Sequence, residues 1–257
     1  MEMTHYDHGV PSWVDLTTPD PAGASAFYGA LFGWQIEEGP PEAGGYRMAM
    51  YRDRPVAGIS PPPPGAEGTY WTTYLTVTTA DDIPALVTGA GGAVHAPPFD
   101  VLDVGRMAVM ADPRGAAFAV WEARAHAGAG IVNEPNTYAW SELVTSDIEG
   151  SKAFYGKVFG WDADTQGEGA SAYTEWKVDG RSVGGMMDRP PDMPAEVPDH
   201  WAVYFTVADI DATVARIGEL GGSVMLGPMA IEPGRFAVCG DPYRAVFNVM
   251  QLHEAGA

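Results

Sequence analysis

Residues 12–34 read SWVDLTTPDPAGASAFYGALFGW, and residues 139–161 read AWSELVTSDIEGSKAFYGKVFGW. At an offset of 127 residues these two stretches agree at 12 of 23 positions. The match continues downstream, where Gly91-Gly92 corresponds to Gly221-Gly222 and Asp112-Pro113 corresponds to Asp241-Pro242. Self-similarity over this distance indicates that the chain consists of two copies of one structural unit.

The repeat predicts two domains, at residues 1–125 and 138–257, joined by a linker at residues 126–137. The linker is rich in Ala and Gly at its start and has no apolar periodicity. A length of 257 residues suits two small domains. The single cysteine, Cys239, has no intrachain partner, so a disulfide framework is excluded and a reducing compartment is favoured.

Each half contains the pattern of a strand, a helix and further strands twice. Trp13–Thr17 is predicted to be a strand, and Asp20 is placed to cap a helix that ends before Gly33. A further strand is expected at Ala93–Ala96. The expected modules therefore cover residues 10–60, 70–123, 138–188 and 200–252, which gives an α+β fold.

Composition excludes several partners. The chain has 34 acidic against 14 basic residues and a formal net charge of −20, which disfavours nucleic acid and anionic membrane surfaces. It has no apolar run long enough for a membrane-spanning helix. The first residues also lack the basic start and apolar core of a signal peptide. A cytoplasmic location is expected.

The repeated elements Asp20, Phe27-Tyr28 and Phe32-Gly33-Trp34, with a later Asp-Pro turn, resemble the glyoxalase/bleomycin-resistance/extradiol-dioxygenase superfamily, also called the vicinal oxygen chelate superfamily. The resemblance covers nearly the whole chain. It implies two tandem domains, each built from two βαβββ modules whose mixed sheet forms a cup around a ligand. Such domains pair, so a monomeric pseudo-dimer or a homodimer is expected.

The resemblance also implies where a divalent metal would be held, at one strand position in each of three strands per domain. In the first half these positions are Trp13, Thr72 and Ala119. In the second half they are Trp140, Ala202 and Asn248. None of these side chains is an ordinary metal ligand, and a catalytic divalent ion needs about three protein ligands. We therefore expect neither a metal nor another cofactor.

Strand side chains alternate between faces, so residues two apart from these positions also face the cup. Asp15, Glu142 and His200 are the candidate acid–base residues, His200 through a pairing with Glu142. Each has a structural alternative: the carboxylates as partners of nearby backbone groups, and the histidine as a loop residue. The candidate ligand-binding residues are polar or large side chains expected on the cup faces: Trp13, Thr72, Tyr74, Trp121, Trp140, Tyr204, Asn248 and Met250. Their alternative role is to fill closed cores.

Two functions follow from this pattern. The leading hypothesis is metal-independent binding of a hydrophobic or aromatic small molecule, in natural-product tailoring, transport or self-resistance. The alternative is a glyoxalase-, dioxygenase- or hydroxylase-like enzyme that acts on an aromatic or α-oxo substrate through acid–base residues or a displaced metal site. The methionines are expected mainly in cores, with a few lining a cavity wall: Met48, Met50, Met107, Met110, Met186, Met187, Met225 and Met229.

Overall fold

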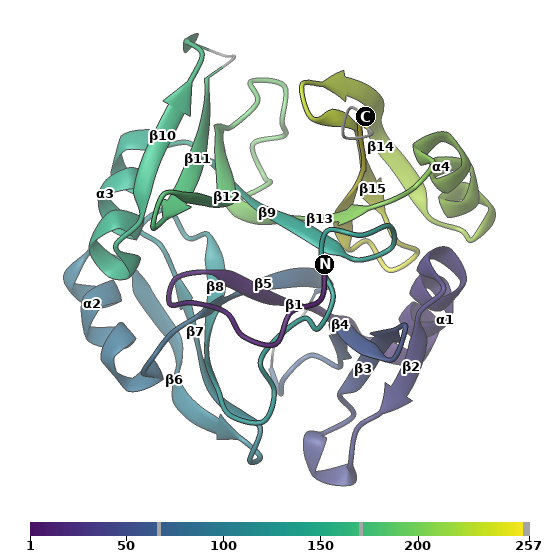
Figure 1. Ribbon diagram of the computed structural model, residues 1–257, viewed down its shortest axis with the longest axis horizontal. Helices are drawn as coiled ribbons and strands as arrows, with labels where there is room; N and C mark the ends of the chain where they lie inside the picture. Colours follow the sequence, from purple (N-terminus) through teal and green to yellow (C-terminus); the bar gives the residue numbers. More distant parts are fainter. Residues whose placement is uncertain (66–67, 170–171, 254–257) are drawn as a thin grey trace.

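The computed structural model describes residues 1–65, 68–169 and 172–253, and it confirms the α+β fold of two tandem units (Figure 1). The first unit contains β1 (Pro11–Thr17), α1 (Pro21–Phe32), β2 (Gln35–Glu38), β3 (Arg47–Tyr51), β4 (Arg54–Ser60), β5 (Tyr70–Thr76), α2 (Ile83–Gly89), β6 (Ala93–Val101), β7 (Gly105–Ala111) and β8 (Ala117–Ala123). The second contains β9 (Tyr138–Thr145), α3 (Ile148–Phe159), β10 (Asp162–Gln166), β11 (Tyr173–Val178), β12 (Arg181–Asp188), β13 (His200–Thr206), α4 (Ile210–Glu219), β14 (Ser223–Ile231), β15 (Gly234–Gly240) and β16 (Val246–Leu252).

The repeated segment forms the same strand and helix in both units. The Asp20 side chain accepts a 2.9 Å hydrogen bond from the backbone N–H of Gly23, and Asp147 caps α3 in the same way. Gly33 ends α1 with a left-handed φ of 72°, a conformation that glycine adopts without a steric penalty. The predicted cap and helix end are thus confirmed.

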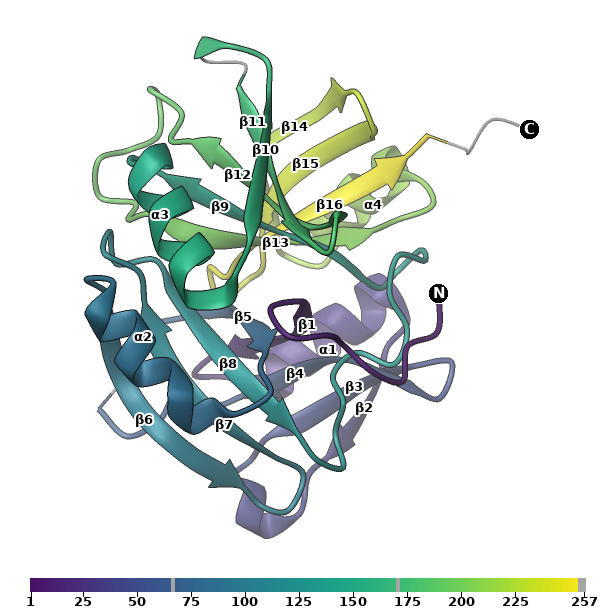
Figure 2. The same ribbon diagram turned by 60° about the vertical axis from the view of Figure 1, so that its left-hand side comes forward.

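Each unit forms one eight-stranded mixed sheet, in the order β2-β3-β4-β1-β5-β8-β7-β6 and, in the second, β10-β11-β12-β9-β13-β16-β15-β14. At the centre of the first sheet, β1 pairs in parallel with β4 and antiparallel with β5, while β5 pairs in parallel with β8. Figure 2 shows the strong curvature of both sheets. Each domain therefore builds a complete cup of its own.

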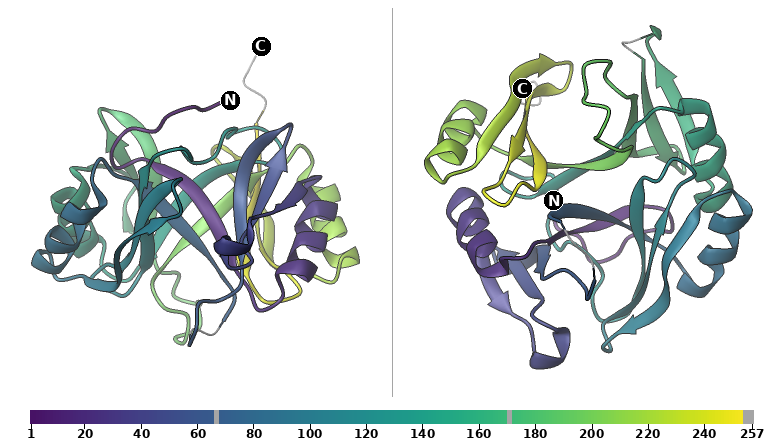
Figure 3. Two further views of the ribbon diagram at one scale, coloured as in Figure 1. Left: turned by 90° about the horizontal axis from the view of Figure 1, so that it is seen from below. Right: turned by 180° about the vertical axis from the view of Figure 1, so that it is seen from behind.

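The two sheets lie back to back with their concave faces directed apart, and helix pairs from different domains flank them (Figures 1 and 3). Helix α1 lies beside α4, and α2 lies beside α3. The buried side chains follow this arrangement: one core cluster joins Phe27 and Phe32 to Phe247, and a second joins Phe118 to Phe159. The hydrophobic core is thus shared across the repeat.

Three features depart from the sequence expectation. Strands β2 and β10 were not predicted, because their polar, mostly exposed sequences show no apolar alternation. Strand β6 continues to Val101, beyond the predicted end at Ala96. Met225 and Met229 are 62% and 44% exposed, so these two do not fill a core, and the expectation that a few methionines line a cavity wall stays a prediction. Both lie on β14, an outer strand of its sheet.

In the described part of the chain no helix is both long and apolar enough to cross a membrane.

Candidate functional site

The strand register brings the first-domain candidates onto the concave face of their sheet. Trp13 lies opposite Tyr74, and Asp15 lies opposite Thr72. Tyr74 is in turn paired with Ala119 on β8, two residues before Trp121. The rings of Tyr74 and Trp121 are 6.4 Å apart, which places these side chains in one cluster.

Asp15 is buried at the centre of this cluster. Its Oδ2 accepts a 2.6 Å hydrogen bond from the Tyr74 hydroxyl. Burial raises the pKa of the Asp15 carboxyl to about 6, against the opposing effect of hydrogen bonds from Tyr74 and Thr72. The indole N–H of Trp13 donates a 2.9 Å hydrogen bond to the hydroxyl of Tyr46 on the neighbouring side of the cup. The first domain thus contains a buried carboxyl bonded to Tyr74, beside a tryptophan bonded to Tyr46.

The second domain contains the same arrangement. Tyr204 donates a 2.8 Å hydrogen bond to Oε1 of Glu142, and the indole N–H of Trp140 donates a 3.0 Å hydrogen bond to the Tyr173 hydroxyl. Burial raises the pKa of Glu142, and hydrogen bonds from Tyr204 and Tyr173 oppose that effect. We call Trp140, Tyr173, Glu142 and Tyr204 the second-domain network.

Tyr46 and Tyr173 were missed by the sequence reasoning, as were the glycines that admit them. A Cβ atom built on Gly58 would lie 1.8 Å from the Tyr46 hydroxyl oxygen, and one on Gly185 would lie 1.8 Å from that of Tyr173. Each tyrosine hydroxyl therefore occupies the space that a side chain would fill. Both pairs recur at the offset of 127 residues, and this identity was the signal that could have revealed them.

The two concave faces differ in exposure. Trp13 is 3% exposed because His126 of the linker covers it, whereas Trp140 is only half-buried. In the second domain, register places Met229 opposite Phe236, and Phe236 opposite Met250, so these side chains share the face of Tyr204. Leu226 lies opposite Val238, which in turn lies opposite Asn248, so both share this face. The accessible apolar side chains of this face include Trp140, Leu226, Met229, Phe236 and Met250.

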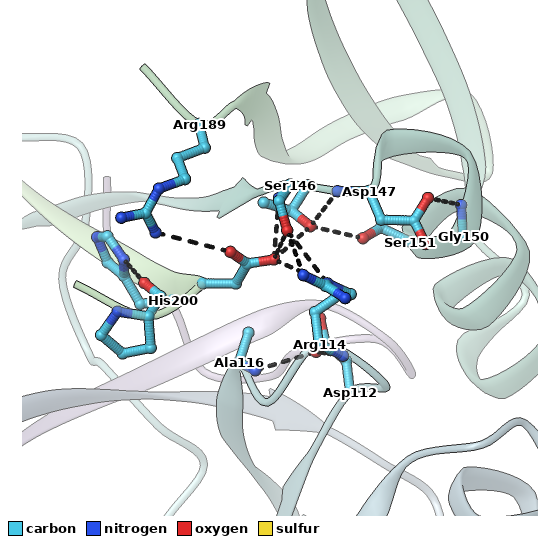
Figure 4. Close-up of polar contacts among 12 residues, drawn as sticks. Asp112, Arg114, Ala116, Ser146, Asp147, Gly150, Ser151, Arg189 and His200 are labelled. Atoms are coloured by element: carbon cyan, nitrogen blue, oxygen red, sulfur yellow. Dashed lines mark hydrogen bonds and ion pairs between the residues drawn. The ribbon is translucent and has the colours of Figure 1, made fainter. Parts of the chain in front are cut away.

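Two predicted residues have local polar partners. The amide Nδ2 of Asn248 donates a 3.2 Å hydrogen bond to the carbonyl of Val203, and the side chain is 3% exposed. His200 lies opposite Val144 in the register, and its Nδ1 makes a 2.8 Å hydrogen bond with the carbonyl oxygen of Pro198 (Figure 4). The proposed acid–base role of His200 stays a prediction.

The residue beside His200, Asp199, ties the two domains together. Its Oδ2 accepts hydrogen bonds of 2.9 Å from both the backbone N–H and the hydroxyl of Ser146. Arg114 of the first domain lies 3.6 Å from the same oxygen and also donates to the Ser146 hydroxyl (Figure 4). Arg189 approaches the other carboxylate oxygen at 3.9 Å. These contacts fix the start of β13, where the second-domain face begins.

The residues present do not fit the metal that the resemblance implies. Trp13 and Thr72 lie on the paired strands β1 and β5, and Ala119 lies on β8, which also pairs with β5. Together these three side chains offer a metal one neutral oxygen, the hydroxyl of Thr72. In the other half, Asn248 offers one neutral amide oxygen, while its amide nitrogen donates to the Val203 carbonyl. Within the described residues, no group of three His, Cys, Asp or Glu side chains is arranged to hold a metal ion.

Two hollows lie away from the buried carboxyls of Asp15 and Glu142. One of about 350 Å³ lies where the linker meets β13 and β16, and is lined by Asn133, Pro135, Thr206, Val207, Ala208, Gln251 and Leu252. The other, of about 280 Å³, lies at the turn between β2 and β3 and reaches Tyr46. Neither is lined by Asp15, Glu142 or Trp140, so neither contains the candidate residues at the centre of the concave faces.

Comparison with known proteins gives a consistent family. A model described as Glyoxalase/Bleomycin resistance protein/Dioxygenase superfamily matches residues 135–249. CFP32 of Mycobacterium tuberculosis (strain CDC 1551 / Oshkosh), whose name assigns it provisionally to the glyoxylases, is 43% identical, with 97% of each chain covered. The anthracycline biosynthesis protein DauV of Streptomyces sp. (strain C5) is 40% identical, with 98% of this chain and 97% of DauV covered.

Solved structures show the same fold at low sequence identity. The 2,3-dioxygenase LapB from Pseudomonas sp. KL28 superimposes with a TM-score of 0.67 at 14% identity, covering 97% of this chain and 95% of LapB. A Mn(II)-bound glyoxalase from Novosphingobium aromaticivorans gives a TM-score of 0.65 at 16% identity, covering 96% of this chain and 84% of that one. These similarities concern architecture alone.

Proposed function

The chain belongs to the glyoxalase/bleomycin resistance protein/dioxygenase superfamily, and on this premise we propose that its second domain binds a hydrophobic, aromatic small molecule without a divalent metal. One observation carries the proposal: the concave face offers accessible apolar side chains around a buried polar cluster. Small-molecule sites commonly combine an apolar lining with a few convergent polar groups.

The apolar part of the face would supply affinity. Trp140 and Phe236 are half-buried, and Leu226 and Met229 are 49% and 44% exposed, so a ligand removes further surface from water when it binds. Burial of apolar area contributes roughly 25 cal/mol per Å², and a planar ring adds stacking on the indole. Met229 and Met250 have flexible side chains that adapt to the outline of the ligand.

The polar part would set orientation. Tyr204 and Tyr173 bracket the Glu142 carboxyl, whose pKa is raised by burial. A carboxyl accepts hydrogen bonds and also donates one when it is protonated, and each of the two phenols both donates and accepts. They are therefore suited to a ligand that carries a phenol or a ring carbonyl at one end. A ligand with a carboxylate or phosphate there would be rejected by an acidic chain of net charge −20.

The names of relatives agree with this chemistry. Two Streptomyces proteins that match nearly the whole chain, at 39% and 40% identity, are named anthracycline biosynthesis proteins. Anthracyclines are planar polycyclic quinones with phenols. Tailoring, transport or self-resistance for an aromatic natural product are the roles that this binding would serve here.

The proposal is tested by titrating the protein with a dihydroxyanthraquinone while tryptophan fluorescence and calorimetric heat are followed. We expect saturable quenching with one site per chain. Trp140→Ala should weaken binding about tenfold, because an aromatic stacking partner and its area are lost. Trp71→Phe, a buried tryptophan outside the face, serves as the control. If a panel of planar aromatic compounds gave neither heat of binding nor a shift in the melting temperature of the protein, the proposal would be refuted.

A second candidate function is acid–base catalysis on the same ligand class, and the raised pKa of Glu142 favours it. A buried carboxyl beside a phenol can hold a proton at the oxygen of a ring carbonyl while the ring tautomerises. Glu142→Gln separates the two functions. For a binder this variant keeps affinity within a few-fold, whereas for an enzyme it abolishes turnover of the bound compound.

Elemental analysis of protein purified without chelators tests the metal-free part of the proposal. We expect no transition metal bound in proportion to the chain. Stoichiometric Fe, Mn, Ni or Zn would overturn the metal-free statement and leave the ligand class to be judged by the titration alone.

A further inference from the structure

The segment that follows β8 crosses the concave face of the first domain. The His126 ring lies 4.5 Å from the Trp13 ring at an interplanar angle of 85°, an edge-to-face contact. It also lies 5.8 Å from the Trp121 ring. The carbonyl oxygen of His126 accepts a 2.8 Å hydrogen bond from the Trp121 indole. The imidazole of His126 thus packs between the rings of Trp13 and Trp121.

Backbone contacts hold this segment against the sheet. The N–H of Ala129 donates a 2.8 Å hydrogen bond to the Ser12 carbonyl, and that of Gly130 donates a 2.7 Å one to the Pro55 carbonyl. Gly128 has a φ of +122°, and a Cβ there would lie 2.6 Å from the Ser12 oxygen. Only glycine at position 128 lets the segment lie so close to β1. The segment predicted to be a linker therefore packs closely against β1 at this point.

The ring of His126 behaves as a neutral heteroaromatic group. Burial lowers the pKa of His126 to about 4. Its Nε2 is buried and has no hydrogen-bond partner within the described chain. A buried, unpaired nitrogen costs free energy, so the contacts that retain this side chain are those with the aromatic rings.

We propose that the concave face of the first domain is itself a site for a planar heteroaromatic ring, and that the imidazole of His126 occupies it. The corresponding Trp140 of the second domain is half-buried, which leaves that face open to a ligand from outside. Among the described residues the two equivalent cups are thus unequal: His126 fills the first, whereas Trp140 in the second stays half-buried. This inference concerns the first domain and does not depend on what the second domain binds.

The test removes the ring and adds it back. His126→Gly should lower the melting temperature of the protein. Imidazole added at millimolar concentration at about pH 8, where imidazole is mostly neutral, should raise the melting temperature again by about 3 °C. Tetrahydrofuran, a non-aromatic ring of similar size, should restore less. His126→Phe should be stable without imidazole and should not respond to it, because its own ring fills the site.

Two controls make the outcome specific. His95→Gly removes an exposed histidine of β6, and neither it nor the wild type should be stabilised by imidazole. Equal stabilisation of all variants, or no response of His126→Gly, would overturn the proposal. Should His126→Gly fail to fold, His126→Ala is carried through the same arms. In the wild type, nuclear Overhauser contacts between the His126 and Trp13 ring protons are expected, and their absence would also contradict it.

Discussion

The hydroxyl of Tyr28 in the first domain donates a 3.1 Å hydrogen bond to Oδ2 of Asp241 in the second, across 213 residues of sequence. Tyr155 makes the corresponding 3.2 Å bond to Oδ2 of Asp112. Both tyrosines come from the repeated Phe-Tyr pair, and both aspartates come from the repeated Asp-Pro turn. The motifs that identify the fold therefore join one domain to the other.

Removal of the Tyr28 hydroxyl should lower the stability of the folded protein. Tyr28→Phe is expected to lower the free energy of unfolding by about 1–3 kcal/mol, because Oδ2 of the buried Asp241 loses its hydrogen bond from Tyr28. The Trp71 indole, which donates a 3.2 Å hydrogen bond to Tyr28, also loses its acceptor. Denaturant unfolding followed by circular dichroism and fluorescence measures the change.

Tyr70→Phe is the matched control, since Tyr70 is 43% exposed, and its change should stay within about 0.5 kcal/mol. Tyr155→Phe should reproduce the Tyr28→Phe effect on the other side of the interface. If both buried variants were as stable as the control, the two hydrogen bonds would not contribute to domain association.

Stability should depend on the charge of Asp15. Burial raises its pKa from 3.8 to about 6, so the folded state holds the proton more tightly than the unfolded state does. Its contribution is fully present below pH 3.8 and is lost as the pH rises through about 6. Asp15→Asn, which cannot ionise, should therefore be more stable than the wild type above pH 7 by up to about 3 kcal/mol.

The comparison of interest is the difference between wild type and variant across pH 4 to 8, since other carboxylates titrate in both. The difference should shrink towards the acid end. Asp103→Asn, at an exposed position, should run parallel to the wild type throughout. A constant offset between Asp15→Asn and wild type at every pH would show that Asp15 ionises as a solvated group.

Much of the fold could be predicted from local signals. Asp20 and Gly33 mark the ends of α1 through capping and a left-handed turn, and the repeat doubles each such signal. Strand β10 could not be predicted, because all five of its residues are exposed and only pairing with β11 defines it. The packing of α1 beside α4 likewise depends on contacts between domains, which periodicity within one helix does not specify.

The candidate site was predicted only in part, for a similar reason. Alternation along β1 indicated that Trp13 and Asp15 share a face, and their contacts agree. The tyrosine that meets Trp13 comes from across the sheet, 33 residues away, and needs a glycine on the strand between. Such a triple is a property of the assembled sheet. The packing of His126 on Trp13 could not be predicted either, because the linker sequence has no apolar periodicity that would place it on the sheet.

The glycines beneath the tyrosines give a prediction that separates the two domains. Gly58→Ala and Gly185→Ala should each destabilise the protein by about 2–4 kcal/mol, because the new methyl group displaces a buried tyrosine hydroxyl. Gly185→Ala should also weaken dihydroxyanthraquinone binding, since it disturbs Tyr173 and Trp140, whereas Gly58→Ala should leave binding within about twofold. Unfolding curves and titrations of the same preparations provide both readouts.

Gly218→Ala is the control for inserting a methyl group. Nothing lies within 4 Å of a Cβ at this position near the end of α4, so the variant should be stabilised by about 0.5–1 kcal/mol. Equal loss of binding in Gly58→Ala and Gly185→Ala would mean that the second-domain network is not specifically involved.

The last prediction compares two residues at equivalent places in the repeat. Met229 on β14 and Phe99 on β6 are 44% and 45% exposed, and each lies opposite a residue of the neighbouring strand on the concave face. If the second cup is the binding site, Met229→Ala removes contact area and should weaken dihydroxyanthraquinone binding about three- to tenfold, or about 1 kcal/mol. Phe99→Ala should have no effect, because His126 closes the first cup. Calorimetry on both variants measures this difference, and in the His126→Gly background a new dependence on Phe99 should appear. A loss caused by Phe99→Ala in the otherwise wild-type chain would place the ligand in the first cup instead.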